Sequence, residues 1–177
     1  MRYSIFLSYP CPINNEQEKF ISKLKGDLQS RGLEPRTLGV NEYDMNEPLV
    51  AIRRLMLESY GLITVAFKRS IIKEGIIKPG TNNEKSVKNQ WITSPYCHIE
   101  PAMAFQVGLP ILIFREKDVI ADGILEKGVI GTYLPEFDLE NNIEQYFESD
   151  EYKQIISKWD GYVKSVIEYR GNPPKLY

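Results

Sequence analysis

Two short, almost wholly apolar runs constrain the fold of this chain more than any other feature. Residues 61–67 read GLITVAF and residues 110–114 read PILIF, and neither run alternates apolar with polar side chains. A strand of this kind is covered on both faces, as in the middle of a parallel sheet between two layers of helices. Parallel neighbours also need crossover connections, which are usually helices. The two runs therefore predict an α/β domain with a central, mostly parallel sheet.

The rest of the 177-residue chain supplies the other strands and the helices. Short β-rich runs predict three more strands at residues 3–9, 33–38 and 130–134, although Pro35 either places the second near a sheet edge or makes it irregular. Apolar residues at helical spacing predict four helices, over about residues 20–31, 47–56, 98–107 and 151–169. We therefore expect one three-layer domain over residues 1–177 with about five strands, a core over residues 3–137 and an added C-terminal helix.

Charge and composition exclude several classes of function. The chain has 22 Lys and Arg against 24 Asp and Glu, a balance without the electrostatic footprint of a protein that binds duplex nucleic acid or anionic membrane. No stretch approaches the roughly 18 apolar residues of a membrane span. The opening MRYSIFLSYP is too short for a signal peptide. We expect a soluble, cytoplasmic protein that binds neither nucleic acid nor membrane.

The chain has only two cysteines and one histidine for metal binding or disulfide formation. Cys11 and Cys97 make neither a disulfide framework nor a zinc site, and the single His98 cannot build a multi-histidine metal centre. We therefore expect no metal and no bound cofactor. Buried free thiols are the simplest interpretation of the two cysteines, with a place at the mouth of a pocket as the alternative.

A basic segment at residues 68–93 interrupts the regular pattern. It is far longer than the connection of about 2–6 residues that is usual in such units. Six basic and two acidic side chains give it a net charge of +4, and Ile71, Ile72, Ile76 and Ile77 argue against plain disorder. The segment is either a surface elaboration or a lid or contact surface for an anionic ligand or a partner.

Glu100 is the candidate functional carboxylate. Pro101 cannot lie deep inside a helix, so the helix is expected to begin near Tyr96 or Cys97, with Glu100 in its first turn. There the helix dipole would favour the ionised form by about 0.3–1 kcal/mol. From position alone, Glu100 is equally a helix cap or a site residue.

At this point the sequence resembles a family. The run IFLSYP at residues 5–10 looks like the first strand and loop of Toll/interleukin-1 receptor (TIR) domains, and SPYCHIEPAMA at residues 94–104 resembles the segment that carries the catalytic glutamate of that family. GLPILIF at residues 108–114 resembles the strand that follows. The resemblance covers about residues 3–137. It looks closest to bacterial TIR-like proteins of antiphage defence, which share features with nucleoside 2-deoxyribosyltransferases.

This resemblance implies a flavodoxin-like fold and cleavage of the nicotinamide–ribose bond of NAD, with NAD as substrate rather than cofactor. Carried over by residue, it makes Glu100 catalytic, lines the pocket with Phe6, Ser8 and Tyr9, and makes residues 41–45, with Tyr43, a loop that gates the site or mediates assembly. The product would be ADP-ribose or a cyclic ADP-ribose signal in antiphage immunity. Self-assembly, or a separate effector or sensor protein, is the implied partnership. The chain departs from the family in Pro101 and in its long basic insertion.

Other residues are candidates for substrate binding. Trp91 and Tyr96 flank the glutamate in sequence and either stack on a base or pack at the edge of the core. Cys97 lies in the same segment. Arg36, at the end of the second expected strand, is the basic residue best placed for a substrate phosphate.

The chemistry leaves three alternatives open. The nicotinamide ring of NAD is a pyridinium cation, and it departs as a neutral molecule that needs no proton. A single carboxylate therefore suffices, whereas ordinary glycoside hydrolysis needs two. A nucleoside deoxyribosyltransferase-like or nucleotide N-glycosidase would use the same carboxylate, but a neutral base needs an acid from His98 or a tyrosine. The third alternative is a non-catalytic module that binds a nucleotide or another TIR surface.

Overall fold

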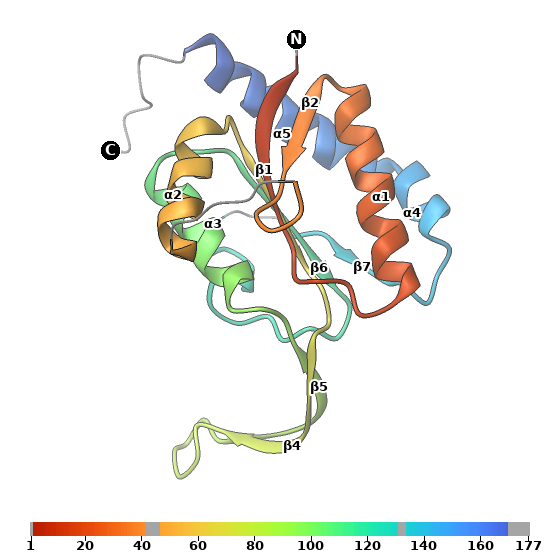
Figure 1. The fold of residues 1–177 in the computed structure, drawn as a ribbon. Helices are drawn as coiled ribbons and strands as arrows, with labels where there is room; N and C mark the ends of the chain where they lie inside the picture. Colours follow the sequence, from red (N-terminus) through yellow and green to blue (C-terminus); the bar gives the residue numbers. More distant parts are fainter. Residues whose placement is uncertain (1, 42–46, 131–133, 170–177) are drawn as a thin grey trace.

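A five-stranded parallel sheet forms the centre of the protein. The computed structural model describes residues 2–41, 47–130 and 134–169. The strand order is β2 (Leu33–Arg36), β1 (Tyr3–Ser8), β3 (Leu62–Ala66), β6 (Ile111–Glu116) and β7 (Glu136–Phe137), and all four pairings are parallel (Figure 1). This is the doubly wound, flavodoxin-like order. The expected α/β fold with about five strands is confirmed.

Helices cover both faces of the sheet. They are α1 (Asn15–Ser30), α2 (Pro48–Glu58), α3 (Tyr96–Gln106), α4 (Ile143–Glu148) and α5 (Asp150–Glu168), with a short 3-10 turn at Gly123–Leu125. α1, α4 and α5 share one apolar core with β1, β3 and β6, while α2 and α3 pack on the opposite face (Figure 1). Every residue of β3 is buried, as its unbroken apolar run predicts. No helix in the described part of the chain combines the length and apolar character that crossing a bilayer requires.

The fifth strand does not lie where the sequence pattern placed it. We expected it at residues 130–134, and β7 is instead Glu136–Phe137; residues 131–133 lie outside the described residues. The pairing with β6 begins where the Arg115 N–H donates to the Pro135 carbonyl at 2.9 Å. Two hydrogen-bonded residues at a sheet edge leave almost no periodic signal. The six-residue α4 was not predicted either, because it is too short for one.

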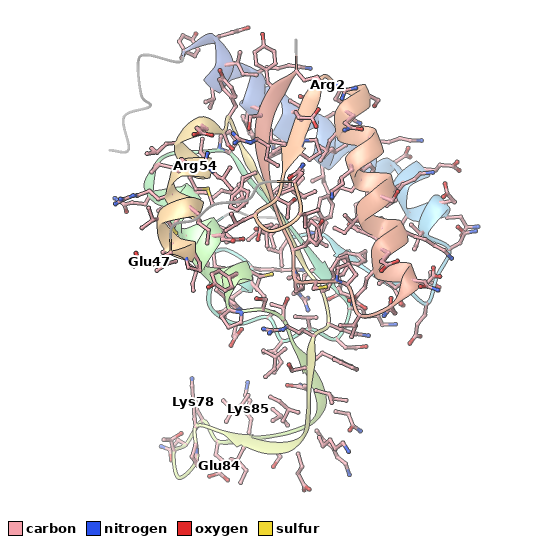
Figure 2. The ribbon with its side chains drawn as sticks, viewed as in Figure 1. Arg2, Glu47, Arg54, Lys78, Glu84 and Lys85 are labelled. Carbon is pink, nitrogen blue, oxygen red and sulfur yellow. The ribbon has the colours of Figure 1, made fainter. Side chains whose placement is uncertain are left out.

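The basic segment folds as an antiparallel hairpin that projects from the body (Figure 1). Its strands, β4 (Ser70–Ile77) and β5 (Lys85–Ile92), form a separate two-stranded sheet. Lys78, Glu84 and Lys85 lie at the far end of this hairpin, well away from the sheet (Figure 2). Its large side chains are mostly exposed, Ile71 and Ile76 among them, and Val87 alone of the described hairpin residues is fully buried.

Gly61 permits the close approach of α5 to the sheet. A methyl group on its Cα would lie 2.7 Å from Val163 Cγ2 and 3.0 Å from Trp159 Cζ2, both in the packed core. Gly61→Ala should therefore destabilise the protein by about 1–3 kcal/mol through overpacking. Gly161→Ala is the matched control, because nothing lies within 4 Å of the added group on the exposed side of α5. That change should stabilise by about 0.5–1 kcal/mol. Urea denaturation measures both, and equal effects would contradict the packing argument.

Candidate active site

A cleft of about 430 Å³ opens at the carboxyl edge of the sheet. This is the edge at which ligands bind in doubly wound proteins, and the volume is in the range of small-molecule sites. The loop after β1, the segment after β2, α2, the base of the hairpin and α3 all contribute side chains. The lining residues are Tyr9, Pro10, Cys11, Pro12, Ile13, Leu38, Pro48, Ile52, Arg69, Ser94, Tyr96 and Glu100.

Glu100 is the one carboxylate among the described residues that line this cleft. α3 begins at Tyr96, so Glu100 is its fifth residue and lies in the second turn; the expectation that it sits in the first turn is wrong. Of the two alternatives for this residue, the helix cap is excluded, because α3 has no side-chain capping hydrogen bond among the described residues. The side chain is 7 % exposed, and burial raises its pKa from 4.5 to about 7. Desolvation therefore outweighs the dipole effect expected to favour ionisation. Near neutral pH the carboxyl exchanges between its two protonation states.

Two buried hydroxyls lie on the sheet face that α3 covers. Ser8 on β1 and Thr64 on β3 are direct partners in the parallel register, and neither side-chain oxygen has a hydrogen-bond partner among the described residues. Phe6 and Leu62, two residues earlier on each strand, pack against α2 and α3, so by alternation Ser8 and Thr64 face the same side. The Ser8 hydroxyl lowers the pKa of Glu100, against the larger effect of burial, through a contact that lacks the geometry of an ordinary hydrogen bond. The site thus holds unused hydrogen-bonding capacity beside the carboxylate.

Three of the predicted site residues line the same cleft. Tyr9 and Tyr96 do so together with Glu100. The Tyr9 hydroxyl accepts a hydrogen bond from Lys25 Nζ at 3.0 Å, which holds its ring at the wall. Tyr43 lies outside the described residues, as does most of the loop at 41–45.

Four other predicted site residues lie elsewhere. Phe6 is in the core between the sheet and α2, and Cys97 is buried against Ala66 and Ile113, with burial raising the pKa of its thiol to about 12. Arg36 pairs with Glu58 at 2.7 Å and does not line the cleft. Trp91 lines a separate, smaller cleft beside Glu116.

His98 does not line the cleft either. Its Nε2 lies 3.9 Å from Asp122, and its ring packs near Gly123. Within residues 2–41, 47–130 and 134–169, no cluster of three or more His, Cys, Asp and Glu is arranged to hold a metal ion.

Arg69 is the site residue that the sequence patterns missed. It follows β3 by three residues and reaches the cleft from the base of the hairpin. A signal for it was present, because the residues that follow a central strand emerge at the binding edge. The helical spacing of Leu49, Ile52, Leu55 and Met56 predicts a buried stripe; Leu49 is exposed instead, and Ile52, though buried, also lines the cleft.

No protein-family model and no curated protein matches this chain. Solved structures to which it is similar include a Clostridium botulinum CMP N-glycosidase, BcmB, at 16 % identity and a TM-score of 0.49, over 82 % of this chain and 95 % of that one. The TIR domains of the activated Roq1 resistosome match at 13 % identity and 0.43, over 93 % and 82 %. The flavoenzyme NAD(P)H:acceptor oxidoreductase FerB of Paracoccus denitrificans matches at 10 % and 0.33, over 98 % and 99 %. Similarity at this level does not identify an activity.

The raised pKa of Glu100 makes a prediction about stability. The folded protein binds this proton more tightly than the unfolded chain, so the stability that the protonated carboxyl contributes is complete below about pH 4.5 and is lost as pH rises through about 7. At pH 8 the loss amounts to roughly 3 kcal/mol. Glu100→Gln should therefore become more stable than the native protein by up to that amount as pH rises from 5 to 8. Denaturant titrations at several pH values measure it. Glu126→Gln, at an exposed position, serves as control, and a difference that does not change with pH would contradict the prediction.

Proposed function

We propose that this protein cleaves the bond between nicotinamide and ribose in NAD, with Glu100 as the catalytic carboxylate. The observation that carries the proposal is a single buried carboxylate in a cleft at the carboxyl edge of the sheet, with no second carboxylate among the described lining residues. The TIR-like segments at residues 5–10 and 94–104 also meet at this cleft, where they contribute Tyr9 and Glu100.

One carboxylate is enough for this reaction. The bond between C1′ of the ribose and the pyridinium nitrogen breaks with its electron pair going to nicotinamide, which leaves as a neutral molecule and needs no proton. Ionised Glu100 stabilises the cationic ribosyl group or attacks C1′. Water that adds to C1′ and loses a proton gives ADP-ribose, while attack by the adenosine part of the same molecule gives a cyclic product.

The rival reaction, cleavage of a nucleoside or nucleotide with a neutral base, has less support. It requires a general acid, and His98 lies outside the cleft. The remaining donors are Tyr9, Tyr96 and Glu100 itself in its protonated form. Use of Glu100 as the acid would reverse the pH dependence, because the protonated form is lost above about pH 7.

Glu100→Gln should lower the rate of NAD cleavage about a hundredfold to a thousandfold, because it removes the charge that faces the ribosyl cation while keeping the side-chain shape. In the native protein, kcat/KM should rise with pH through about 7 as Glu100 ionises. Chromatography of the products from NAD and from deoxynucleosides measures both, and it also separates ADP-ribose from a cyclic isomer. Glu126→Gln should retain activity.

A falling pH profile with deoxynucleoside turnover would favour the rival enzyme. Consumption of neither substrate would favour a non-catalytic module. If NAD is cleaved, the resemblance to antiphage TIR-like proteins extends the proposal to immunity, with NAD loss or a cyclic signal in infected bacteria as the measurable consequence.

We also propose that the hairpin docks on a second copy of this chain. An isolated two-stranded hairpin is marginally stable in water, and this one exposes Ile71, Ile76, Ile77 and Ile92. Residues 68–93 carry +4 in a chain of net charge −2, so the remaining residues carry −6. Two hairpins would repel each other, whereas a hairpin and the acidic body of another copy attract.

Reversing Lys73, Lys78, Lys85 and Lys88 to Glu should therefore weaken self-association, and added salt should weaken it in the native protein. Sedimentation measures the association. Reversal of four exposed lysines outside the hairpin (Lys19, Lys127, Lys153 and Lys158) is the control with the same change in charge. A native protein that remains monomeric at all concentrations would refute docking on a second copy.

A further inference from the structure

We infer that Arg69 binds a phosphate group of the substrate and makes the cleft selective for nucleotides over nucleosides. This inference rests on the proposed function, because it assigns the substrate class of the same cleft. It starts from an arginine at the rim whose charge is not neutralised by any described residue.

Arg69 differs from most arginines of the described chain in having no carboxylate as an ion-pair partner. Five arginines of the described chain form ion pairs with carboxylates: Arg2, Arg31, Arg36, Arg54 and Arg115. Arg69 is exposed, lines the cleft, and has no ion pair with a described residue. Its charge also reaches the neighbouring core, where it lowers the pKa of the buried Cys97 thiol against the larger effect of burial. The cleft therefore presents a permanent positive charge that is available to a ligand.

The backbone that carries Arg69 is fixed by buried groups. The Arg69 N–H donates to the Ile92 carbonyl at 3.0 Å. The preceding residue, Lys68, donates its N–H to the Glu116 carboxylate at 2.8 Å, and its carbonyl accepts from Gln17 Nε2 at 3.1 Å. Gln17 Nε2 also donates to Glu116 at 3.0 Å, and both side chains are buried. Because these hydrogen bonds fix the backbone at Arg69, less conformational entropy is lost when its guanidinium binds a ligand.

The chemistry of the cleft separates the two ends of a nucleotide. A guanidinium presents paired N–H donors that match phosphate oxygens, and the resulting hydrogen bonds are charge-assisted. Ionised Glu100 attracts the cationic ribosyl group and repels phosphate. A phosphorylated riboside satisfies both residues when its phosphate lies at Arg69 and its C1′ at Glu100. Arg36, the phosphate ligand expected from sequence, already has Glu58 as a counter-ion.

Nicotinamide mononucleotide and nicotinamide riboside test the inference, since they differ only in the 5′-phosphate. We expect the native protein to prefer the mononucleotide in kcat/KM. Arg69→Gln should lose about 10- to 100-fold on the mononucleotide and far less on the riboside. The loss in kcat/KM on the mononucleotide should be smaller for Arg69→Lys than for Arg69→Gln, because an ammonium keeps the charge but cannot bind two phosphate oxygens side by side. Arg53→Gln, at an exposed arginine of α2 outside the cleft lining, is the control. Equal losses on both substrates, or no loss on either, would overturn the inference.

Binding to Glu100→Gln separates this inference from the proposed function. Calorimetry with the two compounds should show tighter binding of the mononucleotide, and Arg69→Gln in the same background should remove the difference. Phosphate-dependent binding without cleavage by the native protein would refute the proposed reaction and retain the anion site. Cleavage with no preference for the phosphorylated substrate would support the proposed reaction and refute the anion site at Arg69. Absence of both binding and cleavage would overturn both.

Discussion

Burial of β3 on both faces is the constraint on which the rest of the structure depends. Thr64 is the one polar residue of this strand and is itself buried, so neither face suits water and helices must cover both. The helix after β1 covers one face, and the helix after β3 covers the other. The chain therefore leaves the sheet in opposite directions at these adjacent strands, and a crevice opens between the two connections. Tyr9 enters it from one side, Glu100 and Arg69 from the other.

A buried carboxylate joins the hairpin to that crevice. Glu116, at the end of β6, accepts hydrogen bonds from Gln17 of α1 and from the Lys68 backbone. An isolated buried carboxylate would be costly, and these two donors offset the cost only while α1, β6 and the base of the hairpin stay together. Arg69 is the next residue along the chain. Among the described residues that line the cleft, Arg69 alone carries a positive charge, and one peptide bond joins it to this network.

Sequence patterns predicted the parts of this protein that depend on local repetition. The apolar runs predicted β3 and β6, and helical spacing predicted four helices. The Pro101 argument placed the start of α3 near Tyr96 or Cys97, and it begins at Tyr96. They could not predict partners across the chain. The sequence predicted that Arg36 would bind a substrate phosphate, but in the fold Glu58 forms an ion pair with it. Cys97 lies one helical turn from Glu100, yet its side chain packs in the core. Arg69 was missed because its place in the cleft lining depends on how the hairpin leaves the sheet.

The protonation state of the Glu100 carboxyl connects the stability of the fold, the charge of the substrate and the proposed catalysis. Burial opposes ionisation, yet the proposed reaction uses the ionised form. A pyridinium nucleotide brings its own positive charge into the cleft, and an adjacent cation favours the carboxylate. Binding of a cationic substrate would therefore lower the pKa of Glu100 and ionise the group at the moment when its charge is needed. A neutral nucleoside brings no such charge, so in its complex Glu100 would keep its proton to a higher pH. In the proposed reaction, the same buried carboxyl would therefore discriminate between the two substrate classes by electrostatics, before any contact with the leaving group is considered.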